Sequence, residues 1–230
     1  MHFKGILKSL VSLAAVSFIA GKAQAMPLQL GVMIEPSFEY DKLEPTKKEK
    51  DAGLKDLYKN GLMGVDVPVM VQAIFLDGSF KPFVGLGYSF TYLSRDKFDV
   101  TVSGNKYSSP KETMKNNNIL VQAGVNYMIN PHFSLEGFLG YNYVISPKIT
   151  TDINGKDKDV DLDSVNKFKV GLRGYYTVMD GLDLGLLAGG IFGFSKQKKE
   201  NRLVKGDSDS NYLMGFQVGL SIRKRFDLMK

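Results

Sequence analysis

Residues 117–145 read NNILVQAGVNYMI, then NPH, then FSLEGFLGYNYVI, and this stretch decides the fold. In the first arm apolar residues occupy every second position from Ile119 to Ile129, with Gln122, Gly124 and Asn126 among the residues between them. The second arm repeats the alternation from Phe133 to Ile145. A period of two is the pattern of a β-strand with two different faces. The stretch therefore predicts a β-hairpin whose turn is NPH.

Both arms are long for a soluble protein, in which a strand has about five or six residues. A tilted strand that crosses a bilayer needs about ten. The polar face of the hairpin is rich in Gly and Asn, which suits the crowded lumen of a small barrel better than a sheet face in water. The hairpin therefore predicts two strands of a transmembrane barrel.

The same alternation recurs along the chain and predicts eight strands, at residues 28–38, 62–75, 82–93, 119–129, 133–145, 167–178, 182–194 and 211–223. Within the second strand, Pro68 has no N–H to donate, so we expect a bulge there. Short turns are expected near residues 78, 131 and 180, and long polar loops at 39–60, 94–115, 147–164 and 196–209. Short periplasmic turns and long extracellular loops are typical of outer-membrane barrels. The predicted fold class is an all-β, transmembrane, eight-stranded antiparallel up-and-down β-barrel with three short periplasmic turns and four long extracellular loops.

Aromatic residues support this orientation. Those expected to point outward near the outer rim are Phe90, Tyr92, Tyr141, Tyr143, Phe168, Phe192, Phe194 and Tyr212. Those expected near the inner rim are Phe75, Phe83, Tyr127, Phe133, Tyr176 and Phe226. Two aromatic belts around an aliphatic band match a bilayer. The alternative, a soluble barrel of lipocalin type, would turn its bulky apolar faces inward.

Residues 1–25 have the pattern of a secretory signal peptide. Lys4 and Lys8 form a basic start, an apolar run spans Leu10 to Ala20, and Ala23-Gln24-Ala25 has the small-x-small form of a cleavage site. The apolar run is too short to span about 30 Å of hydrocarbon, and no later run is long enough for a transmembrane helix. We predict a signal peptide at 1–25, a mature start at Met26, and one barrel domain at 26–230.

The absence of cysteine and the small net charge limit how the protein can be stabilised and what it can bind. The chain has no cysteine, so no disulfide can hold this exported protein; a closed strand ladder without a free edge is sufficient. The net charge of +6 falls to 27 − 24 = +3 when Lys4, Lys8 and Lys22 leave with the signal peptide. That charge is too weak and too mixed in sign to indicate a nucleic-acid partner.

Four segments carry a resemblance to a known family: the signal ending AQA, KPFVGLGYSFTY (81–92), INPHFSLEGFLGYNY (129–143) and YLMGFQVGLSIRKRF (212–226). Together they resemble the small eight-stranded outer-membrane barrels of Gram-negative bacteria, of the opacity-protein type of surface antigen. The resemblance implies an outer-membrane adhesin, surface antigen or structural membrane component that acts through its loops. Such barrels usually end on an aromatic residue, whereas here Asp227 to Lys230 follow Phe226 and Lys224 occupies an outward position.

Charged residues also fall on inward positions of the predicted strands: Glu35, Asp66, Glu136, Lys167, Lys169, Arg173, Asp183 and Arg223. A charge inside a narrow barrel is costly unless it is paired. We place Glu35 and Asp66 at the outer level with Lys167 and Lys169, and the other four at the inner level. An eight-stranded lumen is just large enough to be filled with side chains, so we expect a salt-bridge network that plugs it. The alternative is a thin ion path, which would make the protein a small porin-like channel.

The sequence favours no enzymatic site. After signal removal His132 is the only histidine, and it lies in the predicted NPH turn. Without a second histidine or a cysteine, no usual nucleophile–base pair or zinc site can be assembled, which argues against the third hypothesis, a lipid-modifying enzyme. Aspartates at 157, 159, 161 and 163 could suit calcium, but they lack the EF-hand order of ligands, and a solvated loop is the favoured interpretation. We expect no catalytic residue, metal or cofactor.

The last predicted loop is basic. It carries Lys196, Lys198, Lys199, Arg202 and Lys205 against Glu200, Asp207 and Asp209. This loop is the candidate site for a polyanion such as lipopolysaccharide phosphates or a sulfated host glycan. The alternative is that the basic residues only solvate the loop. The partners expected for this monomer are outer-membrane lipid, lipopolysaccharide and a host surface ligand, and not nucleic acid.

Overall fold

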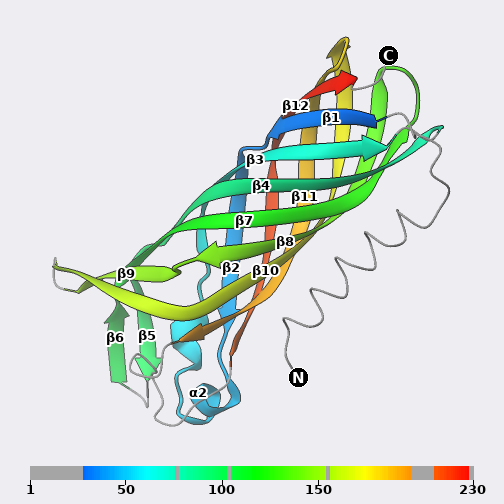
Figure 1. Cartoon of the computed structure of the whole chain (residues 1–230). Helices are drawn as coiled ribbons and strands as arrows, with labels where there is room; N and C mark the ends of the chain where they lie inside the picture. Colours follow the sequence, from blue (N-terminus) through cyan, green and yellow to red (C-terminus); the bar gives the residue numbers. More distant parts are fainter. Residues whose placement is uncertain (1–27, 76–77, 103–104, 154–155, 198–209, 228–230) are drawn as a thin grey trace.

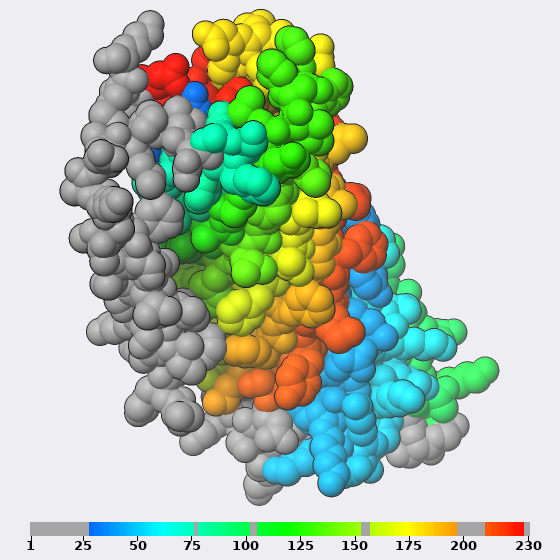
Figure 2. Space-filling view, turned by 90° about the vertical axis from the view of Figure 1, so that its right-hand side faces the viewer, coloured from blue at the N-terminus to red at the C-terminus, as the bar shows by residue number. Residues whose placement is uncertain are grey.

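The computed structural model describes residues 28–75, 78–102, 105–153, 156–197 and 210–227. Its strands are β1 (Leu28–Ile34), β2 (Ser37–Glu44), β3 (Leu62–Phe75), β4 (Phe80–Arg95), β5 (Phe98–Val102), β6 (Asn105–Ser109), β7 (Lys111–Met128), β8 (Phe133–Ile145), β9 (Lys148–Ile153), β10 (Lys156–Met179), β11 (Leu182–Gln197) and β12 (Asn211–Asp227). β1 and β2 are two halves of one stave, and both pair with β12 on one side and β3 on the other. This first stave (the word is used here for one barrel strand) closes a ring of eight antiparallel staves, of which the other seven are β3, β4, β7, β8, β10, β11 and β12. The ring confirms the predicted fold class. Figure 2 shows the closure, where blue β2 lies beside red β12.

The barrel has two unlike ends (Figure 1). At one, called here the turn end, lie the β3–β4, β7–β8 and β10–β11 connections and the end of β12. Gly78 (φ +58°) and Gly181 (φ +68°) adopt left-handed conformations that suit glycine in two of these tight turns. In the third, the Asn130 Oδ1 atom accepts hydrogen bonds of 2.9 Å from the backbone N–H groups of His132 and Phe133.

The other end, called the loop end, is more ordered than the sequence predicted. The first connection holds helix α2 (Lys47–Asp51) and the 3-10 helix η1 (Lys55–Tyr58). The second holds the β5–β6 hairpin, and the third is the hairpin of β9 with the long β10. The expected strand ends were therefore wrong: the staves run on to Glu44 in β2 and begin at Lys111 in β7 and Lys156 in β10. Backbone N–H and C=O groups need partners whatever the side chains are, so a ladder can continue through polar sequence.

The bulge expected at Pro68 is also wrong. β3 pairs with β4 in unbroken register, with Pro68 opposite Ser89. On its other side Pro68 faces Glu35, in the two-residue gap between β1 and β2, and the Glu35 N–H donates to the Pro68 carbonyl at 3.0 Å. The register with β3 is the same before and after this gap. The N–H and C=O of a strand residue point toward the same neighbour. The N–H that Pro68 lacks would therefore point toward Glu35 and not toward β4, so the β3–β4 ladder is undisturbed.

The outer surface of the staves is apolar. Outward side chains at mid-height include Leu139 and Leu186, each 68% exposed. Aromatic residues predicted near the two rims point outward, among them Phe90, Tyr143 and Tyr176, but Phe83 does not: it is 2% exposed and faces the lumen. Adjacent residues of a strand face opposite sides, so Phe83 must oppose its outward neighbour Val84. None of the helices in the described ranges is both long and apolar enough to cross a membrane.

Candidate functional site

The lumen holds two groups of paired charges. The first, called the loop-side cluster, consists of Glu39, Asp41, Asp66, Lys167 and Lys169, each at most 4% exposed. The Lys167 ammonium contacts Glu39 and the Asp41 Oδ2 atom, the latter at 2.5 Å. The Lys169 ammonium donates to Glu39 at 2.8 Å, Asp66 at 2.9 Å and the Gln217 side-chain oxygen at 2.9 Å. Every charge of this cluster is thereby held by strands from opposite sides of the barrel.

The second group, called the turn-side cluster, consists of Glu35, Glu136, Asp183, Arg173, Arg223 and Arg225. The Arg173 guanidinium binds Glu35 and lies 2.6 Å from Glu136. Glu136 also meets Arg223 at 2.6 Å, and Arg223 meets Asp183 at 3.0 Å. These contacts form a chain of alternating charges, which reduces the cost of burying each one.

Apolar and uncharged polar side chains occupy the rest of the interior, the polar ones including Gln72, Asn118 and Asn142. One buried group joins Met33, Met70, Leu120 and Tyr175, and a second joins Ile74, Phe83, Phe138 and Leu187. The two guanidinium groups stack on these layers, Arg173 at 3.8 Å from the Phe138 ring centre and Arg223 at 4.0 Å from that of Tyr175. Gly124 leaves room for the layer, since a Cβ there would lie 2.7 Å from the Phe83 ring.

The eight predicted lumen residues all lie inside, at most 4% exposed, but two details differ from expectation. Glu35 pairs with Arg173 of the turn-side cluster, not with Lys167 or Lys169. Glu39 and Asp41 are also inside the lumen, although the predicted first strand ends at Phe38, where the chain becomes charged. The signal was present, since Glu35, Ser37, Glu39 and Asp41 continue the inward period of two.

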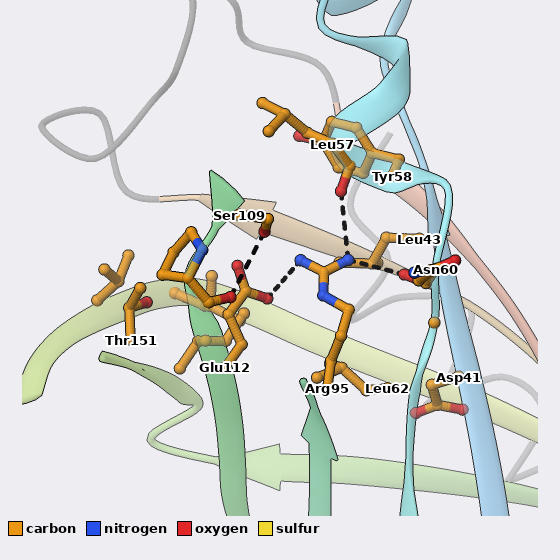
Figure 3. Close-up of a pocket in the computed structure, with 15 residues that line it drawn as sticks. Asp41, Leu43, Leu57, Tyr58, Asn60, Leu62, Arg95, Ser109, Glu112 and Thr151 are labelled. Carbon is orange, nitrogen blue, oxygen red and sulfur yellow. Dashed lines mark hydrogen bonds and ion pairs between the residues drawn. The ribbon is translucent and has the colours of Figure 1, made fainter. Parts of the chain in front are cut away.

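At the loop end the lumen opens into a pocket of about 300 Å³ (Figure 3). Its walls come from β2, η1, β3, β4, β6, β7, β9 and β10, and include Leu43, Leu57, Leu62, Ile149, Val160 and Leu162. Arg95 reaches across it: one guanidinium nitrogen donates to the carbonyls of Leu57 (3.2 Å) and Asn60 (2.7 Å), and the other contacts Glu112 at 2.7 Å. Arg95 thus ties the η1 connection to the barrel.

A second set of contacts secures the same connection. Thr46 and Glu49 cap α2 reciprocally, with Thr46 accepting from the Glu49 N–H at 3.2 Å and Glu49 accepting from the Thr46 N–H at 2.8 Å. Glu49 also accepts from the Tyr58 hydroxyl at 2.5 Å and from the Asn211 amide at 2.7 Å. Burial, reinforced by Glu49, raises the pKa of Tyr58 above its ordinary value. Burial likewise raises the pKa of Glu112, against the opposing charge of Arg95.

The closed ladder, the apolar exterior and the filled lumen occur together in one class of protein. The fold is that of a small outer-membrane β-barrel.

Solved structures similar to this barrel are of the same kind. Neisserial surface protein A matches with a TM-score of 0.45 and 11% identity over 86% of this chain and 97% of its own. The attachment invasion locus protein Ail of Yersinia pestis matches with a TM-score of 0.40 and 16% identity over 86% and 99%. The outer membrane protein OprG of Pseudomonas aeruginosa matches with a TM-score of 0.44 and 11% identity over 88% of this chain and 97% of its own. No family model matches the sequence, and no curated protein does.

The structure describes some of the remaining predicted residues and not others. Of the basic loop, Lys196 lies 3.9 Å from Asp163, whereas Lys198, Lys199, Arg202 and Lys205 lie outside the described residues, as does the predicted signal peptide. His132 is exposed in the turn-end NPH turn, with its ring centre 6.1 Å from that of Tyr176. Asp159 pairs with Lys148 at 2.6 Å. Within the described ranges no group of three or more His, Cys, Asp or Glu side chains is placed to hold a metal ion.

Proposed function

We propose that this protein is an outer-membrane surface protein of adhesin or surface-antigen type, closed along its axis and active at its loop end. The observation that carries the proposal is the filled lumen: both ionic clusters and two apolar layers occupy the space through which an ion path would run. An eight-stranded barrel has just enough interior volume for such a filling. The loop end, by contrast, offers ordered helices, hairpins and a pocket.

Planar-bilayer recording tests the closed lumen. The refolded barrel should produce no discrete conductance steps, while a porin inserted in the same bilayer reports that the assay works. Steps from the wild-type barrel that change ion selectivity in Lys169→Gln would support the alternative, a small channel lined by the clusters.

The loop end would bind a polyanion through the basic loop, Lys196, Lys198, Lys199, Arg202 and Lys205. Attraction of that kind weakens with salt, because screening acts within about 8 Å at physiological ionic strength. Heparin and lipopolysaccharide binding by the refolded barrel should fall steeply across a salt series and be lost when these five residues become Gln.

The matched control replaces five exposed lysines of the first connection, Lys47, Lys48, Lys50, Lys55 and Lys59, by Gln, which removes the same charge from the same end. Equal loss of binding in the two variants would show that binding depends on the net charge of the loop end and not on the basic loop. Undiminished binding in the basic-loop variant would exclude that loop as the site.

A further inference from the structure

The loop-end pocket is lined by three charged side chains, and each of them is already paired. Arg95 and Glu112 contact each other at 2.7 Å. Asp41, which Figure 3 shows apart from that pair, contacts Lys167 of the loop-side cluster. A charged ligand would therefore leave water without gaining an unpaired countercharge here, and burying an unpaired charge is costly. The electrostatics of the pocket favour an uncharged ligand.

The unpaired polar atoms of the lining offer a ligand no contact. Among the described side chains that line the pocket, the Asp41 Oδ1 atom and the Arg95 Nε atom are the buried polar atoms without a hydrogen-bond partner. Both atoms have almost no accessible surface. A molecule in the pocket therefore reaches neither of them, and its binding has to come from the rest of the wall.

Most of the accessible surface of that wall is apolar. It is built from segments far apart in the sequence, with Leu57 from η1, Ile149 from β9 and Leu162 from β10. Burial raises the pKa of Tyr58 and of Glu112, because a poorly hydrated environment disfavours their charged forms. The wall therefore offers hydrocarbon contacts in a place where water is poorly held.

The volume of the pocket sets the size of the ligand. The volume is about 300 Å³, whereas an engineered apolar cavity of about 150 Å³ in another protein stays dry and binds benzene. This pocket therefore has room for one aromatic ring with a short side chain, or for an alkyl chain of similar volume. Replacing poorly ordered water by an apolar group favours binding.

We propose that the loop-end pocket binds an uncharged, mainly hydrocarbon molecule of the size of an alkylbenzene, held against Leu57, Ile149 and Leu162. The molecule stays at the loop end, because the loop-side cluster and two apolar layers fill the lumen beyond the pocket. It also bridges η1 to the β9–β10 hairpin. The site shares no residue with the basic loop, and its test uses no polyanion, so this proposal and the proposed function can fail separately.

Methyl NMR of the refolded barrel in lipid nanodiscs tests the site with three single-ring probes: toluene, benzylammonium and benzoate. The methyl groups of Leu62 and Ile149 report the pocket, while those of the outward Ile119 report partition into lipid. With concentrations given as free probe in water, toluene should shift the Leu62 and Ile149 signals saturably. It should bind at least roughly tenfold more tightly than either ion, because a charge finds no partner in the pocket. Equal affinities, tighter binding of an ion, or shifts that do not saturate or are confined to Ile119 would overturn the proposal.

Two leucines of the first connection give matched variants. Leu57 lines the pocket and Leu54 does not, although both are half-buried. Leu57→Asn should weaken toluene binding at least roughly fivefold, because the ligand loses apolar contact, whereas Leu54→Asn should bind as the wild type does. Unchanged affinity in Leu57→Asn, or an equal loss in Leu54→Asn, would refute the site. The three-probe comparison on wild type decides the question even if Leu57→Asn does not fold.

Discussion

Arg173 is the single residue on which the turn-side cluster most depends. It is fully buried and binds both Glu35 and Glu136. Arg173→Ala should lower the free energy of unfolding by about 3–5 kcal/mol, because it leaves two buried carboxylates short of a partner. Lys148→Ala, which breaks the exposed pair with Asp159, should change it little. Urea unfolding in lipid vesicles measures both, and similar midpoint shifts would contradict the inferred role of burial.

Glu112 predicts a pH dependence at the loop end, beyond the outer aromatic belt. Burial raises its pKa above the ordinary 4.5. At pH values between the unfolded and the folded pKa, the folded barrel therefore holds a proton on Glu112 that the unfolded chain has released. This contribution to stability is present below the unfolded pKa and is lost as pH rises through the folded pKa. Measured between about pH 4 and 8, the unfolding free energy of wild type relative to Glu112→Gln should therefore decrease with rising pH. A flat or rising difference would show that Arg95 outweighs burial.

At the scale of elements, the alternation of short and long connections predicts which end faces outward. The chain has no cysteine, so single cysteines report without background. Cysteines in place of Lys48, Lys106 and Lys158, on three loop-end connections, should react with an impermeant maleimide on intact cells. Those in place of Ser79 and Asn130, on two turns, should react only after the membrane is opened. The reverse labelling would invert the topology.

Two elements differ from what their sequences indicate, for different reasons. Pro68 causes no bulge, because its missing N–H would point toward Glu35 and not toward β4, and the side on which a strand lacks a donor is known only once its neighbours are known. The loop-end hairpins are polar and lack the alternation of apolar and polar residues that indicates a strand, so the sequence predicts loops there. The β9–β10 hairpin is continuous with the barrel, since β9 pairs with both β7 and β10, whereas β5 and β6 form a separate two-stranded sheet.

At the scale of the whole molecule, export is the remaining prediction. We expect the mature chain to begin at Met26, since the short apolar run and the Ala23-Gln24-Ala25 site fit cleavage by signal peptidase. N-terminal sequencing of the barrel from outer membranes measures this directly. A chain that retains Lys22 or Met1 would contradict it.

The sequence by itself determined the barrel, its eight staves and which side chains face inward, because a period of two assigns each residue to a face without knowledge of any neighbour. Inward placement of Glu136, Lys169 and Arg223 follows from that local rule. Which charges meet was decided only by the tertiary structure. Glu35 and Arg173 lie 138 positions apart in the chain, and their contact depends on the stagger between strands on different sides of the barrel, which no local pattern encodes. Glu39, Asp41 and Asp66 likewise meet Lys167 and Lys169 only because β2, β3 and β10 bring their side chains into one lumen.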